Sequence, residues 1–143
     1  MNQKNVPVIG KNPRLAVQNA YGLHLTLDGY GCDKAKLGDM ALVFKVLDKL
    51  PSAIGMKKIT TPYVMPYDGD KKPEDWGISG FVMIAESHIS IHTYPEKNYL
   101  TADVYSCNHF NSDKAVEFLI NAFKIKEAEK NEVIRGLKFP RTA

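Results

Sequence analysis

The sequence has little of several features that would assign its class at once. Only two cysteines, Cys32 and Cys107, occur among 143 residues, which is too few for a disulfide scaffold or for a zinc site built from thiolates. No stretch approaches the roughly 20 apolar residues of a membrane-spanning helix, and residues 1–20 lack an apolar segment of signal-peptide length. We therefore expect a cytoplasmic protein without a membrane partner.

Strong charge of one sign is also missing. The formal net charge is +3 and the lysines are scattered along the chain, so electrostatics gives no reason to expect a nucleic-acid partner. No internal repeat or low-complexity tract is evident. With 44% hydrophobic and 24% charged residues, the chain has the composition of one globular domain.

Periodicity predicts the order of the secondary structure. Residues 1–20 contain Pro7 and Pro13 without sustained periodicity, and we interpret them as an N-terminal arm before a single domain over residues 21–143. Alternating apolar residues, bounded by glycine, proline and asparagine, predict strands near residues 23–27, 59–65, 78–85, 88–94, 99–107 and 132–137, the last at a sheet edge.

Two amphipathic helices are expected between these strands. The first is capped by Asp33, ends at Pro51 and carries an apolar stripe of Leu37, Met40, Phe44 and Leu47. The second is capped by Ser112 and carries a stripe of Ala115, Phe118, Leu119, Ala122 and Phe123. This order favours an α+β fold, a two-layer sandwich in which both helices cover one face of a mostly antiparallel sheet. The other face is then solvated or buried by a partner.

The most informative segment is residues 84–96, which sets an acid and a serine before two histidines inside a strand-like run. Ile89 and Ile91 alternate with Ser90 and His92, so one strand face packs and the other carries polar groups. On the next predicted strand Cys107 shares a face with Asp103 and Tyr105, so a thiol can sit beside a histidine of a neighbouring strand. Such a pair supports nucleophilic or acid/base catalysis, although a lone cysteine at a strand end is more often a packed residue.

Metal and phosphate sites are not indicated. His88 and His92 are separated by roughly 13 Å within a strand, too far to share an ion. His24 and His109 have no acidic or thiol companion at suggestive spacing, and we interpret both as surface or internally satisfied side chains. The residues 77–80, Gly-Ile-Ser-Gly, lack the pattern of a phosphate loop, and Cys32 is interpreted as a small packed residue.

Three motifs make the chain resemble a known family. They are Gly77-Ile78-Ser79-Gly80, Glu86-Ser87-His88-Ile89-Ser90-Ile91-His92-Thr93-Tyr94-Pro95-Glu96 and Asp103-Val104-Tyr105-Ser106-Cys107. These motifs are similar to those of the prokaryotic S-adenosylmethionine decarboxylase proenzymes, which are self-processing pyruvoyl enzymes. Weaker similarity covers most of the chain after about residue 20.

The resemblance implies autocatalytic cleavage between Glu86 and Ser87. A β chain of residues 1–86 and an α chain of residues 87–143 would result, with a pyruvoyl group made from Ser87 that forms a Schiff base with the substrate. The family needs no other cofactor and no metal. At the matching positions His92 is the proton acceptor in processing, Ser79 assists processing, and Cys107 is the proton donor in decarboxylation.

The resemblance also implies a small-molecule substrate, S-adenosylmethionine, a place in spermidine biosynthesis, and a homodimer of processed protomers. Glu96 matches the position that binds the ribose hydroxyls. The phenylalanine expected to stack on adenine is replaced by Pro73, and Trp76 or Tyr67 is expected to take its place. A pyruvoyl-dependent arginine or ornithine decarboxylase is therefore an alternative, as are a Cys/His hydrolase and a small-ligand-binding domain.

Overall fold

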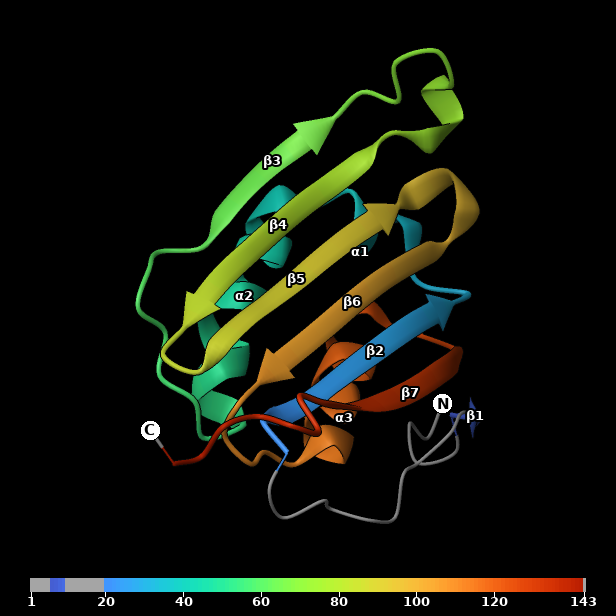
Figure 1. Ribbon diagram of the computed structural model, residues 1–143. Coiled ribbons are helices and arrows are strands. Elements are labelled where there is room, and N and C mark those ends of the chain that lie inside the picture. Colours follow the sequence, from blue (N-terminus) through green and yellow to red (C-terminus); the bar gives the residue numbers. More distant parts are fainter. Residues whose placement is uncertain (1–5, 10–19, 143) are drawn as a thin grey trace.

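A seven-stranded sheet with helices on one face makes up the part of the chain that the computed structural model describes, residues 6–9 and 20–142 (Figure 1). Its strand order is β1-β7-β2-β6-β5-β4-β3, and every neighbouring pair is antiparallel except β1 with β7. The α+β sandwich expected from the sequence is therefore confirmed. The strands are β1 (Val8–Ile9), β2 (Gly22–Tyr30), β3 (Tyr63–Tyr67), β4 (Gly77–Ile84), β5 (Ser87–Tyr94), β6 (Tyr99–Ser106) and β7 (Glu127–Arg135).

The helices are α1 (Lys34–Leu37), α2 (Met40–Ala53) and α3 (Ser112–Phe123), with short 3-10 turns η2 (Pro73–Asp75) and η3 (Pro95–Lys97). Figure 1 shows α2 and α3 side by side behind the sheet. The strands turn alternate residues toward them, so that in β5 Ile89 and Ile91 are fully buried while His92 is exposed. Each such buried side chain contributes about 1.5–3 kcal/mol.

The first predicted helix is two helices in the structure. The Asp33 carboxylate caps α1 as expected, but the chain breaks at Gly38 and the Asp39 carboxylate caps α2. The side chain of this second aspartate accepts a hydrogen bond from an N–H of the next turn, which stabilises the start of a new helix over the continuation of α1. The helix also passes Pro51, because that residue removes only one helical hydrogen bond and the Ile54 N–H still reaches the Leu50 carbonyl at 3.2 Å.

The expected stripe on this helix is wrong in part. Met40 and Phe44 are 47% and 40% exposed, whereas the side that faces the sheet consists of Val43, Val46, Leu47 and Leu50. Both sets have helical spacing, so only the position of the sheet separates them. In α3 the N-cap is Asn111, whose side chain accepts from the Lys114 N–H, and Ser112 is the first helical residue.

The strand bounds also differ from the expected ones. β3 begins at Tyr63 rather than near residue 59, and β6 ends at Ser106, one residue before Cys107. The last strand starts at Glu127 and lies between β2 and the two residues of β1, so it is not the edge strand that its sequence suggested. The other residues of the expected N-terminal arm, 1–5 and 10–19, lie outside the described part of the chain.

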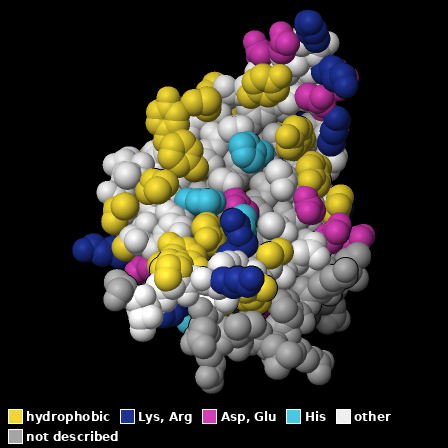
Figure 2. Space-filling view, in the orientation of Figure 1, with side chains coloured by type: hydrophobic (Ala, Val, Ile, Leu, Met, Phe, Trp, Pro, Cys, Tyr) yellow, Lys and Arg dark blue, Asp and Glu magenta, His cyan; other side chains and the backbone are white. Residues whose placement is uncertain are grey.

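The sheet face away from the helices carries both apolar and polar side chains, and the described C-terminal segment packs only near its Ser87 end, where Phe139 contacts Tyr21. We call five of its side chains on β3 and β4 the apolar strip, and each is between 39% and 56% exposed. Figure 2 shows hydrophobic side chains gathered on this side of the face, next to the histidines at its centre. The apolar strip consists of Tyr63, Met65, Tyr67, Phe81 and Met83.

Among the described residues, no helix has the length and apolar character needed to cross a bilayer.

The packing of α3 on the sheet gives a stability prediction. Leu119 is 1% exposed, so Leu119→Ala should lower the free energy of unfolding by about 2–5 kcal/mol through lost burial and a cavity. Glu117→Ala, on the exposed side of the same helix, should change it by less than about 0.5 kcal/mol. Urea denaturation in a Ser87→Ala background, which removes the serine at the cleavage site expected from the sequence, measures both. Equal losses would contradict the assigned burial.

Candidate active site

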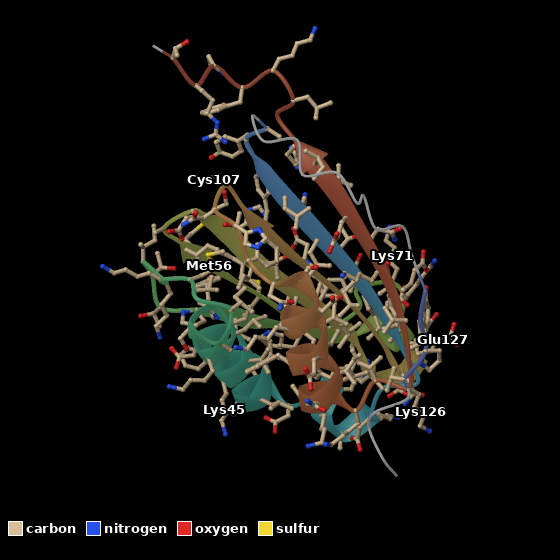
Figure 3. The ribbon with its side chains drawn as sticks, turned by 90° about the horizontal axis from the view of Figure 1, so that it is seen from below. Lys45, Met56, Lys71, Cys107, Lys126 and Glu127 are labelled. Carbon is tan, nitrogen blue, oxygen red and sulfur yellow. The ribbon has the colours of Figure 1, made fainter. Side chains whose placement is uncertain are left out.

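The residues predicted for cleavage and catalysis fall into two groups at opposite ends of the open sheet face. Glu86, Ser87 and Cys107 lie where β5 begins and β6 ends, because Ser87 pairs with Ser106. Ser79 and His92 pair with each other across β4 and β5, five residues further along β5. Figure 3 shows Cys107 at the end of the sheet, next to the start of β2.

At the first end, the peptide bond expected to break is held by a backbone hydrogen bond. The Cys107 N–H donates to the Glu86 carbonyl oxygen at 3.0 Å. That carbonyl belongs to the Glu86–Ser87 peptide, and the serine hydroxyl follows it directly in the chain. An N–H aimed at a carbonyl oxygen stabilises the negative charge that develops there when a nucleophile adds to the carbon.

Both residues of this peptide carry a local energetic cost. Ser87 has φ +152°, a region that side chains other than glycine rarely adopt and that costs on the order of 1–3 kcal/mol. The Oε2 atom of Glu86 is buried without a hydrogen-bond partner among the described residues, and such an atom costs about 1–3 kcal/mol. Breaking the peptide would free both groups to relax.

At the second end, Ser79 and His92 form a hydrogen-bonded pair. The Ser79 hydroxyl lies 2.9 Å from Nδ1 of His92, and the histidine side chain is exposed on the open face. The pair has the geometry of a hydroxyl and the base that removes its proton.

One chain does not bring these two ends together. Five residues of β5 separate Ser87 from His92, which is about 17 Å at roughly 3.4 Å per residue. The prediction that Cys107 sits beside a histidine of the neighbouring strand is wrong for His92, because Cys107 follows Ser106 whereas His92 pairs with Thr101. A Cys107–His92 hydrolase pair within one chain is contradicted by this register.

A third group is made by Glu96, which follows His92 in the chain, together with Trp76 and Lys34. The Glu96 carboxylate accepts hydrogen bonds from the Lys34 ammonium at 2.7 Å and from the Trp76 indole N–H at 3.2 Å. The bond from Lys34, and after it the bond from Trp76, holds the pKa of Glu96 below its usual range. The indole also packs over Gly38, where a Cβ would come within 2.9 Å of the ring. Tyr67 lies nearby, since it pairs with Gly77, and its side chain is 50% exposed.

Between the two ends lies a polar cluster centred on Asp103. His24 Nε2 and His88 Nε2 lie 2.6 and 3.2 Å from the same carboxylate oxygen, and the Ser90 hydroxyl donates to the other. Burial alone would raise the pKa of Asp103, but the hydrogen bonds from Ser90, His24 and His88 outweigh it and hold the pKa below its usual range. His24 is therefore an internally satisfied side chain, as interpreted from the sequence, and its acidic partner is Asp103, 79 residues away.

The same three ligand atoms are close enough to one another to hold a metal ion. However, Arg135 lies 3.0 Å from Nδ1 of His24, and a guanidinium can only donate. Nδ1 is then the acceptor and Nε2 carries the proton that His24 donates to Asp103. This set is accordingly a completed hydrogen-bond network with a cation beside it, rather than a group of free lone pairs.

Comparison with known proteins agrees with the motifs. Residues 23–136 match the family described as S-adenosylmethionine decarboxylase. The S-adenosylmethionine decarboxylase proenzyme of Thermococcus kodakarensis is 34% identical to the chain, and the match covers 82% of this chain and 78% of the relative. The proenzyme of the same description from Clostridium botulinum is also 34% identical, and that match covers 80% of this chain and 94% of the relative. The crystal structure of the adenosylmethionine decarboxylase of Aquifex aeolicus superposes with a TM-score of 0.71 at 28% identity, covering 87% of this chain and 98% of that one.

The chain belongs to the S-adenosylmethionine decarboxylase family. The family match includes all three motifs quoted from the sequence. As a member of this family the protein is a decarboxylase, and its named relatives are proenzymes.

One contact in this decarboxylase was not predictable from its motifs. Lys34 reaches Glu96 from α1, 62 residues away, and lysines in a first helical turn carry no signal of such a contact. Cys32 is buried as expected, and burial raises the pKa of its thiol to about 12. Cys107 is the exposed thiol of the two.

The Asp103 cluster predicts a pH-dependent stability. Asp103→Asn in the Ser87→Ala background should lower the free energy of unfolding at neutral pH by about 1–3 kcal/mol, because three donors lose a charged acceptor. The folded-state pKa of Asp103 is depressed, so its contribution is present above the unfolded value, about 3.9, and is lost as pH falls through the lower folded value. The difference between parent and variant should therefore shrink in acid. Glu74→Gln, on exposed η2, should show no such trend in parallel urea titrations.

Proposed function

We propose that the chain is a proenzyme that cleaves itself between Glu86 and Ser87 and then decarboxylates S-adenosylmethionine with a pyruvoyl group at position 87. The product would be the aminopropyl donor of spermidine biosynthesis. The observation that carries this proposal is the hydrogen bond from the Cys107 N–H to the Glu86 carbonyl, on the N-terminal side of a serine with positive φ.

The cleavage follows from groups at this junction. The Ser87 hydroxyl adds to the Glu86 carbonyl carbon, the C–N bond breaks and an ester to the serine oxygen forms, while the Cys107 N–H stabilises the intermediate oxyanion. A base then removes the Ser87 α-proton, and the ester leaves as the free carboxylate of Glu86. The dehydroalanine that remains takes up water and releases ammonia to give the pyruvoyl group.

The residues present fit this group. After cleavage, position 87 would carry a planar carbonyl in place of the serine whose backbone has a strained φ. The exposed Cys107 thiol would lie beside this carbonyl. A pyruvoyl group supplies an electrophilic carbonyl that accepts the electrons released when carbon dioxide leaves. Cys107 then provides the proton for the substrate carbon.

The base for cleavage comes from a second copy in this proposal. His92 and Ser79 are about 17 Å from Ser87 of their own chain at roughly 3.4 Å per residue. A two-fold axis across the open face would lay β5 of each copy antiparallel to β5 of the other, which sets the Ser87 end of one over the His92 end of its partner. Each dimer would then hold two sites, each built from both chains.

The open face has the composition of such an interface. The apolar strip exposes five large side chains, including Tyr63 at 56% and Phe81 at 46%, and contiguous exposed apolar surface of this kind usually marks a binding surface. Aromatic and methionine side chains are enriched in interface centres. A second copy buries this strip and completes the site at once.

S-adenosylmethionine is favoured over arginine or ornithine by the Glu96 group. The carboxylate is ionised and positioned by Lys34 and Trp76, which suits hydrogen bonds from a ribose. The indole and the exposed Tyr67 ring supply aromatic surface near it, and aromatic faces attract adenine and a sulfonium cation. These rings stand in for the phenylalanine that Pro73 replaces.

The first test of the proposal is cleavage itself. Purified protein should separate into chains ending at Glu86 and beginning at position 87, and the second should be blocked and react with borohydride. Ser87→Ala should abolish cleavage and the release of labelled carbon dioxide from S-adenosylmethionine, whereas Cys107→Ala should retain cleavage and lose turnover. Arginine and ornithine serve as parallel substrates. A single unmodified chain with full activity would sink the proposal.

Mixing two inactive variants tests the shared site. Neither Ser87→Ala nor His92→Ala should cleave alone. In a mixed dimer, one site combines an intact Ser87 with the intact His92 of the other chain, so His92→Ala chains should be cut after mixing. Intact-mass analysis shows which chain is cut. If each site lay within one chain, mixing would yield no fragments, and cleavage of His92→Ala alone would remove the proposed role of that histidine.

A further inference from the structure

Tyr21 lies at the Ser87 end of the sheet, and none of the three motifs includes it. Its backbone N–H donates to the Arg135 and Gly136 carbonyls at 2.9 and 3.1 Å. The next residue, Gly22, lies so close to β6 that a Cβ there would come within 2.7 Å of the Cys107 Cα. Backbone register therefore holds Tyr21 beside Cys107.

The Tyr21 ring is oriented by the chain that follows β7. Phe139 packs edge-on against it with ring centroids 4.7 Å apart, and Tyr105 lies 6.1 Å away on the sheet. The Arg141 guanidinium lies 5.1 Å from the centre of the Phe139 ring and also donates to the Ala20 carbonyl. The C-terminal segment thus folds back over Tyr21 and restricts its ring.

The Tyr21 phenol lies near both reacting side chains of this end. Hydrogen bonding to Cys107 and the charge of its sulfur raise the pKa of Tyr21, burial raises it further, and a hydrogen bond with Ser87 acts in the opposite direction. A tyrosine with a raised pKa keeps its proton at neutral pH and remains a hydrogen-bond donor.

On the basis of the function proposed above, we propose that Tyr21 is a positioning residue for Cys107. When Cys107 protonates the substrate carbon, the S–H bond breaks, a C–H bond forms and the electron pair stays on sulfur. The Tyr21 O–H, held in place by Phe139, donates to that sulfur and stabilises its negative charge. The same contact directs the thiol toward position 87.

Tyr21→Phe tests this role because it keeps the ring and removes the hydroxyl. Cleavage should proceed, whereas alkylation of Cys107 by iodoacetamide at a fixed neutral pH should slow about tenfold, since the thiolate is the nucleophile and loses a hydrogen bond. The kcat should fall by a similar factor with KM unchanged, and the alkaline limb of its pH profile should move to higher pH. Cys32 does not interfere, because it is buried and the pKa of its thiol is about 12.

Tyr30→Phe is the matched control. Tyr30 lies at the other end of β2, where its hydroxyl donates to Glu129 at 3.2 Å, so alkylation and turnover should match the parent protein. Phe139→Leu, which keeps the phenol but loosens its ring, should slow alkylation by a smaller factor. This second variant tests the inference if Tyr21→Phe does not fold.

Two outcomes would overturn the positioning role of Tyr21. One is a Tyr21→Phe variant with the alkylation rate and pH profile of the parent protein. The other is a loss of cleavage in this variant, which would show that the hydroxyl acts on Ser87 instead. The alkylation comparison also works on an uncleaved chain. If the parent protein itself is not cleaved, the proposed function fails, while the contact between Tyr21 and Cys107 is still tested.

Discussion

The pairing of β5 with β6 is the constraint on which the rest of the structure depends. With Ser87 opposite Ser106, the Cys107 N–H meets the Glu86 carbonyl at 3.0 Å. Moving the register by one residue would turn Ile89 and Ile91 to the open face and remove this contact. The buried side of the sheet thus maintains the geometry of its reactive end.

Stability and reactivity are divided between the two faces of this sheet. The helix-facing side buries a continuous cluster of leucine, isoleucine, valine and phenylalanine side chains. That burial sustains a junction where Ser87 has φ +152° and a Glu86 oxygen lacks a partner among the described residues. Strained groups of this kind persist only where the surrounding structure determines them, and they concentrate at functional sites.

The open face is polar at its centre and apolar on one side. Asp103 collects His24, His88 and Ser90 there, and Arg135 adds a cation that stacks 4.8 Å from the centre of the Tyr105 ring. Tyr105 in turn lies next to Tyr21, so the central cluster is continuous with the Ser87 end. A partner on this face would bury satisfied polar groups, and this limits the cost of desolvation.

Much of the fold was predictable because alternation is local. The face of each residue in β5 and β6, the two-layer arrangement and the Asp33 cap follow from spacing alone. The exact stripe on α2 does not, since Met40 and Phe44 have the same spacing as the buried set and only the sheet position decides between them. The break at Gly38 depends similarly on the competing cap at Asp39.

By itself the sequence determined which residue types are present at the reactive peptide, and its motifs determined the family. Only the tertiary structure decided which of them meet. His24 reaches Asp103 across 79 residues, Tyr21 is brought to Cys107 by a segment more than a hundred residues later, and Ser87 is kept apart from His92 of its own chain. The physical reason is that strand register and the return of the C-terminal segment are set by burial over the whole sheet, which no local pattern records.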